Sequence, residues 1–284
     1  KYWVRSKNDD LKVIPTDSIV MKVDKEAVRR SGMMIPGDSI PDYMHISLKG
    51  KRALYKSELM MLEMLAEANW ERPIYMAVSV GTENHLGMGN HFVQEGLTYR
   101  FTPFDTEKTG IKLDSEKMYD NLMNKFKFGG IDKEGIYIDE NAMRMCYSHR
   151  RIFSQLIGQL IREGKTDKAK AALEYAEKMI PAYNVPYDWQ NGAMQMAEAY
   201  YQLGEKEKGD NIMKALADKA VEYLTWYLSL DDQRFAMSSH EVVDYQLPIL
   251  STEVKLMQKY NSELAPVYDS KLNELYQMCV DRMK

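Results

Sequence analysis

The sequence is short of the residues that mark a disulfide framework, a zinc site or a membrane span. Its 284 residues include two cysteines, Cys146 and Cys279, which are too few and too far apart for either kind of site. Each lies on the apolar stripe of a predicted helix, so we expect both to be buried as small hydrophobic side chains. No run of 18 or more apolar residues occurs, so no membrane-spanning helix is predicted.

Positive charge is not in excess. The chain has 38 Lys and Arg against 42 Asp and Glu, a net charge of −4, and its basic residues are scattered instead of forming a stripe. This distribution argues against a nucleic-acid partner. Hydrophobic residues make up 45% and charged residues 28%, as in globular proteins. The length predicts about two domains.

The first part of the chain, residues 1–138, shows the alternation of short strand and helix patterns that is typical of an α/β domain. Strands are expected over 17–23, 42–48, 74–80, 97–103 and 136–140, helices over 24–32, 56–70 and 115–130, and one helical turn over 92–96. In the helix over 56–70, Leu59, Leu62, Leu65 and Ala66 recur at helical spacing and predict its buried face. Residues 74–80 are almost all apolar, as in a central strand covered on both sides.

The second part, residues 139–284, predicts an all-helical domain with an internal repeat. Gly164 and Gly204 each follow one helix pattern and precede another. The residues after each glycine match at the offsets 5, 9, 12 and 17 of a tetratricopeptide repeat: Ala169, Leu173, Ala176 and Pro181, then Gly209, Met213, Leu216 and Val221. In such a repeat, small residues lie where the two paired helices touch, and large apolar residues lie where the following helix packs. A third helical pair is expected near the carboxyl end, with a kink at Pro248.

The loop over residues 81–91 is the stretch most like a site of chemistry. Its candidate ligand-binding residues are Glu83, His85, Gly87, Gly89 and His91. Because the loop follows a strand, we expect it at the carboxyl edge of a sheet, where α/β proteins bind ligands. It lacks the third glycine of a dinucleotide fingerprint, the Lys-Ser or Lys-Thr of a P-loop, and the HExxH or CxxC spacing of zinc sites. The competing interpretation is that glycine allows a turn here and that the histidines have only a structural role.

Elsewhere the sequence predicts no catalytic residue, cofactor or bound metal. Carboxylate pairs at 139–140 and 231–232 occur where helices begin, so capping accounts for them. Three aromatic residues, Tyr183, Tyr187 and Trp189, cluster in the segment between the two repeats. They are candidate partner-binding residues that could line a peptide or glycan groove, although packing over a helix end is the common role of such an insertion.

Several blocks together carry a family resemblance: "NWERPIYMAVSVG", "FVQEGLTYRFTP", "MYDNLMNKFKFGG", "YIDENAMRM" and "LIREGK". They resemble the soluble carboxy-terminal region of a bacterial family of large membrane proteins. The amino-terminal half of that family spans the membrane many times and is similar to protein O-mannosyltransferases. The family is described as a domain of unknown function or as proposed glycosyltransferases. The resemblance supplies no catalytic residue for this region.

The resemblance implies that sequence upstream of Lys1 forms a membrane-spanning half, and that this chain is tethered at the periplasmic face of a bacterial membrane. Two functions are compatible with the sequence. In the first, the chain is a non-catalytic interaction domain whose helical repeats bind a protein or glycan acceptor for a membrane-bound glycosyltransferase. In the second, the α/β part is an enzyme domain that binds a small ligand or metal through residues 81–91.

Overall fold

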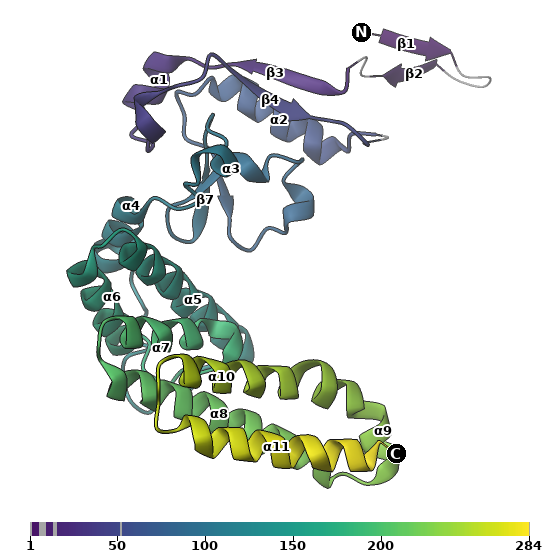
Figure 1. The fold of residues 1–284 in the computed structure, drawn as a ribbon. Helices are drawn as coiled ribbons and strands as arrows, with labels where there is room; N and C mark the ends of the chain where they lie inside the picture. Colours follow the sequence, from purple (N-terminus) through teal and green to yellow (C-terminus); the bar gives the residue numbers. More distant parts are fainter. Residues whose placement is uncertain (1, 6–9, 14–15, 52, 284) are drawn as a thin grey trace. The chain divides into compact units, whose positions relative to one another are not determined.

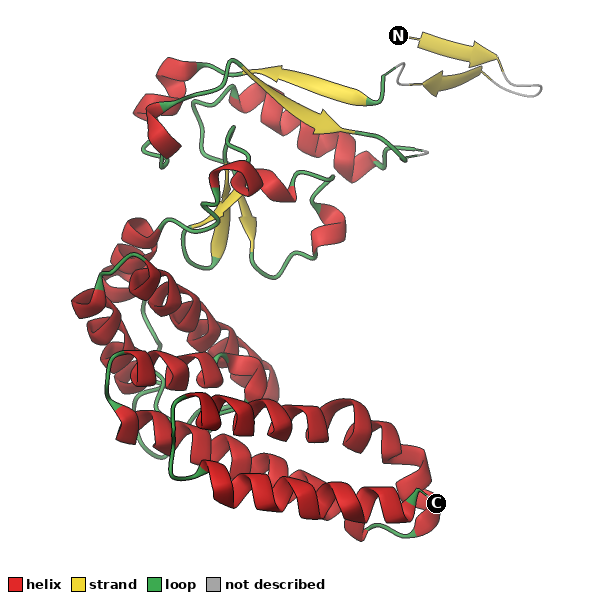
Figure 2. Ribbon diagram, viewed as in Figure 1, coloured by secondary structure: helices red, strands yellow, loops and turns green. Residues whose placement is uncertain are grey.

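The chain forms two compact units in the computed structural model, which describes residues 2–5, 10–13, 16–51 and 53–283. The units are Lys1–Asn121 and Leu122–Lys284. The first holds the strands with short helices, and the second is helical (Figure 2). The predicted fold class, an α/β part followed by an all-helical part, is thereby confirmed. The domain bounds 1–138 and 139–284 stay a prediction, and Lys1, where upstream sequence is expected, lies outside the described residues.

The strands of the first unit pair in small antiparallel sheets (Figure 1). The strands are β1 (Tyr2–Arg5) with β2 (Asp10–Val13), β3 (Ser18–Lys22) with β4 (Tyr43–Ser47), and β5 (Tyr75–Ala77), β7 (Thr98–Phe101) and β6 (Phe92–Gln94) in the order β5-β7-β6. Strand β4 buries Met44 and Ile46 on one face, as its alternating pattern predicts.

Three strand-level expectations are wrong. Strand β5 lies at an edge instead of the centre, because it pairs only with β7 in the order β5-β7-β6. It ends after three residues, where Val80 N donates to Ala77 O at 3.0 Å and the chain turns. Residues 92–94 form strand β6 instead of a helical turn, because they pair with β7. Residues 136–140 form no strand in the described chain. Strands this short carry too little periodicity to fix their place in a sheet.

Short helices connect the strands of this unit. They are α1 (Lys25–Arg30), η1 (Pro36–Asp38), α2 (Lys56–Ala68), η2 (Thr82–Asn84), η3 (Gly89–His91), α3 (Thr106–Thr109) and α4 (Ser115–Asp120). Asp24 caps α1 by accepting a bond from Ala27 N at 2.9 Å, as predicted. In α2 the buried residues include Leu65 and Ala68, whereas Leu59 is 48% exposed. The predicted buried face of α2 is therefore wrong in part, because one side of the helix contacts the small sheet.

A buried ion cluster fixes the first unit internally. Glu95 is 5% exposed and accepts bonds from Tyr75 Oη and Lys117 Nζ, each at 3.1 Å, and Arg100 lies 3.6 Å from the same carboxylate. Arg100 also donates to Ser31 O at 2.7 Å. One carboxylate thus joins β5, β7, α4 and the turn after β6, and Arg100 adds a link to Ser31, the residue that ends α1.

The second unit consists of antiparallel helical pairs (Figure 1). Its helices are η4 (Asn121–Lys125), α5 (Glu140–Arg162), α6 (Thr166–Met179), η5 (Trp189–Asn191), α7 (Ala193–Gln202), α8 (Lys206–Ser229), α9 (Asp232–His240), η6 (Glu241–Gln246), α10 (Leu247–Lys259) and α11 (Ala265–Arg282). Asp139 and Asp231 cap α5 and α9, which confirms the capping interpretation of both carboxylate pairs. Cys146 and Cys279 are buried as predicted.

The turns and the buried positions predicted for the repeat are present, whereas its likeness to tetratricopeptide repeats stays a prediction. Gly164 and Gly204 adopt φ angles of 72° and 79°, the left-handed conformation that ends a helix most easily at glycine. The residues at the first three offsets after each glycine are buried: Ala169, Leu173 and Ala176 in one copy, and Gly209, Met213 and Leu216 in the other. Pro248 follows the π-helical segment η6 and occupies the first turn of α10, where proline is tolerated.

Substituting Gly209 by Ala is expected to destabilise the second unit by about 1–3 kcal/mol. An added Cβ would lie 2.7 Å from the Tyr201 ring, and that ring is held by stacking on Tyr260 with centroids 4.9 Å apart. Chemical denaturation measures the change. Gly158→Ala is the matched control, because its Cβ would meet only the flexible Arg162 guanidinium at 3.7 Å; it should stabilise by about 0.5–1 kcal/mol. Equal effects of both substitutions would contradict the packing.

Candidate functional site

The connection between α6 and α7, residues 180–192, forms one wall of the candidate site and is held by Arg150 on α5. The guanidinium donates to the carbonyl oxygens of Ile180 at 2.8 Å, Val185 at 2.6 Å and Pro186 at 3.0 Å. Arg150 is 1% exposed, and burial lowers its pKa to about 10, so it stays charged at neutral pH. Loop carbonyls buried in this way require such donors.

Two further contacts fix the same connection. Tyr187 lies against the Arg150 guanidinium, 5.0 Å from ring centroid to Cζ, and its hydroxyl donates to Glu177 at 3.2 Å. Burial, with the Glu177 charge second, raises the pKa of Tyr187 to about 12. Asn184 Nδ2 donates to the carbonyls of Ile131 at 2.8 Å and Lys133 at 2.6 Å. The connection is therefore anchored to the helical unit on both of its sides.

The last part of the connection presents Trp189 and Gln190 at the surface. Asp188 caps η5 by accepting from Gln190 N at 2.9 Å, and Lys219 on α8 donates to the other oxygen of Asp188 at 2.6 Å. Gly192 has a φ of 80°, and a Cβ there would lie 2.4 Å from Ser154 Oγ on α5. Glycine is needed at this point because the backbone passes so close to α5.

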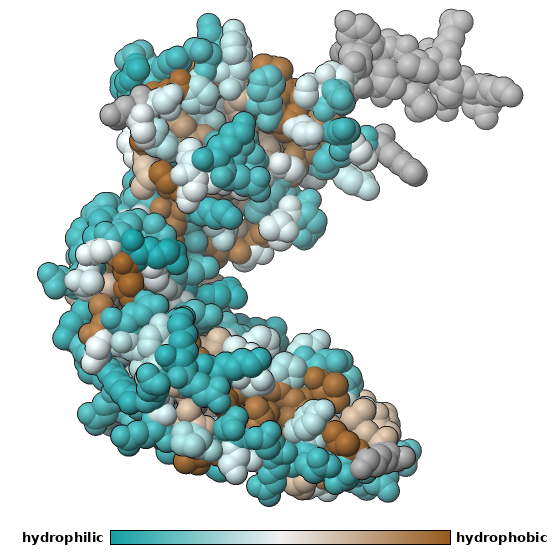
Figure 3. Space-filling model, in the orientation of Figure 1, coloured by the Kyte–Doolittle hydropathy of each residue, from teal (hydrophilic) through white to brown (hydrophobic). Residues whose placement is uncertain are grey.

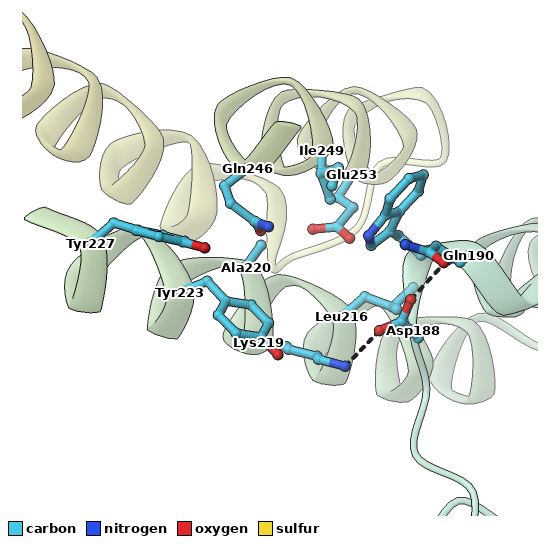
Figure 4. A pocket seen from close by; sticks show the side chains of 11 residues that line it. Asp188, Gln190, Leu216, Lys219, Ala220, Tyr223, Tyr227, Gln246, Ile249 and Glu253 are labelled. Atoms are coloured by element: carbon cyan, nitrogen blue, oxygen red, sulfur yellow. Dashed lines mark hydrogen bonds and ion pairs between the residues drawn. The ribbon is translucent and has the colours of Figure 1, made fainter. Parts of the chain in front are cut away.

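A pocket of about 270 Å³ opens between this connection, α8 and α10 (Figure 4). Three aromatic residues line it, Trp189, Tyr223 and Tyr227. The polar and charged lining residues are Asp188, Gln190, Lys219, Gln246 and Glu253, and the apolar ones are Leu216, Ala220 and Ile249. Trp189 and Tyr223 are each 44% exposed, so their rings border both the pocket and the solvent. Aromatic walls with a few polar groups are typical of ligand sites.

Glu253 is the most unusual residue of the pocket. It is 1% exposed, and its Oε2 has no hydrogen-bond partner among the described residues. Its carboxyl group points from α10 into the space between α10 and α8 (Figure 4). Burial, with the Asp188 charge second, raises the pKa of Glu253 to about 8. A carboxyl group in this setting is mostly protonated at neutral pH and ionises when a cation approaches it.

A second hollow of about 360 Å³ adjoins the pocket and shares three of its residues, Trp189, Gln190 and Gln246. His240, Glu241 and Tyr245 complete its lining, and all three lie in or beside the π-helical segment η6. Short π-helical segments occur often at functional sites because they reorient side chains within a helix. The two hollows therefore lie next to each other on the helical unit.

The residues predicted in the loop over 81–91 lie in the first unit, in the connection between β5 and β6. The sheet is antiparallel, so the expectation of a common carboxyl edge is wrong. His85 and His91 are 6% and 7% exposed, and the His85 ring contacts Phe92 with centroids 5.2 Å apart. Burial lowers the pKa of His91. Glu83 accepts a bond from Asn84 at 3.0 Å.

Ligand binding by this loop, including Gly87 and Gly89, stays a prediction. Gly87 has a φ of 70°, in keeping with a turn. No group of three or more His, Cys, Asp or Glu side chains in the described ranges is arranged to hold a metal ion. No helix in the same ranges is long and apolar enough to cross a membrane.

The three aromatic residues predicted to bind a partner occupy different places. Trp189 lines both hollows, Tyr187 packs against Arg150, and Tyr183 is 61% exposed and donates to Asp132 O at 2.6 Å. Sequence reasoning missed Glu253. Its signal is a carboxylate on an apolar stripe, since Leu250 and Met257, at spacings of three and four residues, are both buried.

Comparison with known proteins gives one match. A protein-family model described as TMEM260-associated domain 2 matches residues 1–121. Neither the curated proteins nor the solved structures contain a match to the chain. For these residues, the match confirms that the chain is similar to a domain associated with a membrane protein. The remaining parts of the resemblance stay a prediction.

Replacing Arg150 by Met should lower the free energy of unfolding by about 3 kcal/mol or more, because three buried carbonyls lose their donor. Limited proteolysis should then cut within 180–192. The neighbouring Arg151, whose side chain is exposed, provides the control: Arg151→Met should change stability by less than about 0.5 kcal/mol. An uncut connection in the Arg150 variant would show that Arg150 does not hold it.

The Glu253→Gln substitution should change how stability depends on pH. The folded chain binds the Glu253 proton more tightly than the unfolded chain, because its pKa rises from 4.5 to about 8. The free energy of unfolding therefore falls as pH rises between these values. The free energy of unfolding of the variant should equal that of the parent at pH 4.5 and exceed it by up to about 4 kcal/mol at pH 8.5. Urea denaturation across this range measures both curves, and Glu222→Gln, at an exposed position of α8, should leave the parent curve unchanged.

Proposed function

We propose that this chain is a binding region, without catalytic activity of its own, of a membrane-associated protein similar to the O-mannosyltransferases. Its helical unit would hold the polypeptide or glycan acceptor. The observation that carries the proposal is the pocket between residues 188–190, α8 and α10, where aromatic rings, side-chain amides and a carboxyl group converge. Aromatic faces pack on apolar ligand surfaces and the polar groups fix ligand orientation.

The match of residues 1–121 to a domain associated with a membrane protein supports the proposed context. In this proposal the transfer chemistry belongs to a membrane-spanning half upstream of Lys1, and the chain lies at the periplasmic face. The helical unit also exposes apolar side chains among its charged ones (Figure 3). Separately, Trp226 and Met237 in this unit are 54% and 76% exposed. Exposed apolar side chains of this kind are compatible with a surface that contacts a protein or a glycan.

The 284-residue chain should bind members of a peptide and glycan array, and binding should depend on the pocket rings. Tyr223→Ala should weaken the strongest interaction at least about tenfold, since aromatic anchors in pockets carry much of the binding energy. Calorimetry on each hit measures the change. Tyr137→Ala is the matched control, because Tyr137 lies in the same unit outside the pocket and is 91% exposed.

Two outcomes would contradict the proposal. One is an array on which no peptide or glycan is retained. The other is an equal loss of binding in the Tyr223 and Tyr137 variants, because binding would then not involve the pocket.

A further inference from the structure

The pocket holds a carboxyl group without a positive partner. Lys219 is the cation that lines the pocket, and Asp188 already engages it at 2.6 Å. The Lys219 ammonium also lies 5.9 Å from the centroid of the Tyr223 ring. Asp188 and Lys219 balance each other, so the charge of Glu253, once ionised, is in surplus. A buried carboxylate of this kind is costly unless a cation pairs with it.

Aromatic rings surround the same space. Trp189, Tyr223 and Tyr227 line the pocket together with Glu253. The face of an aromatic ring attracts a cation within about 6 Å of its centroid, and the attraction grows when the cation leaves water. Rings with one carboxylate therefore form a site for a compact cation. The side-chain amides of Gln190 and Gln246 supply further acceptors beside them.

We propose that this pocket binds a primary ammonium group of the acceptor, through an ion pair with Glu253 and contact with the rings of Trp189 and Tyr223. The proposal rests on the proposed function, because it names the chemical group that the acceptor presents to the pocket. Two sources supply that group, the side chain of a lysine and the amine of an amino sugar. A charge-assisted bond to a desolvated carboxylate favours such a ligand over its neutral counterpart.

The charged and titratable groups around Glu253 set the expected pH dependence. They are Asp188 and Lys219, Tyr223 and Tyr227 on α8, Tyr268 on α11, and the His240–Glu241 pair beside the adjoining hollow. Glu253 must ionise to pair with the ammonium, and its pKa is raised to about 8. Ammonium binding should therefore strengthen by about tenfold per pH unit between pH 6 and 7 and level off above pH 8.

Calorimetric titration of the full 284-residue chain with four probes tests the assignment. The probes are Nα-acetyl-lysine methylamide and its Nε-acetylated form, and glucosamine and N-acetylglucosamine. We expect at least tenfold tighter binding of one amine than of its acetylated form at pH 7, where both amines are mostly charged. Whichever amine binds identifies the source as polypeptide or amino sugar. The pH profile is measured with the lysine probe, whose ammonium stays charged throughout.

Glu253→Gln should remove both the preference for the amine and the rise with pH, while Glu222→Gln should keep both. Because His240 is intact in both variants, its titration cannot produce a difference between them. Binding of array ligands that depends on Tyr223 but shows neither an amine preference nor an effect of Glu253→Gln would overturn the ammonium assignment and leave the proposed function standing. An array and probe set with no binding at all would overturn both.

Discussion

The guanidinium of Arg150 is the constraint on which the rest of the candidate site depends. Three carbonyl oxygens of one connection converge on it, together with the ring of Tyr187. A buried loop needs donors for its backbone carbonyls, and a planar guanidinium with five N–H groups supplies several from one point. With the connection fixed, Asp188 meets Lys219 and Trp189 reaches the pocket. The buried guanidinium thus fixes the position of Trp189 beside the pocket.

Close backbone contacts complete the arrangement. Gly192 lets the connection approach α5, and Gly209 lets α8 approach the ring of Tyr201. The first contact positions the connection that carries Trp189, and the second lets α8, which carries Tyr223 and Tyr227, pack closely against α7. The pocket is therefore a product of packing between helical pairs, and no single helix contains it. In this respect it resembles the ligand sites that form between helices of bundles.

Much of the helical unit could be predicted from the sequence, and less of the first unit could. Gly164 and Gly204 mark turns whose conformation is local, and the apolar spacing after them follows from the helix period, so one stretch of chain contains the needed information. Strand β5 ends after three residues because of a turn and pairs with β7, which follows in the chain only after β6; local pattern does not contain that pairing. The setting of Glu253 could be predicted only in part. Its place on an apolar stripe is visible in the sequence, but its pocket depends on residues far away along the chain.

The π-helical segment η6 affects the direction in which the Glu253 carboxyl group points. The segment runs directly into α10, which carries Glu253. A π-helical turn corresponds to one residue inserted into an α-helix, and each α-helical residue turns the chain by about 100°. Removing one residue from the segment would rotate all of α10 by that angle and carry the Glu253 carboxyl group away from Trp189. The number of residues in this segment therefore sets the direction in which the Glu253 carboxyl group points.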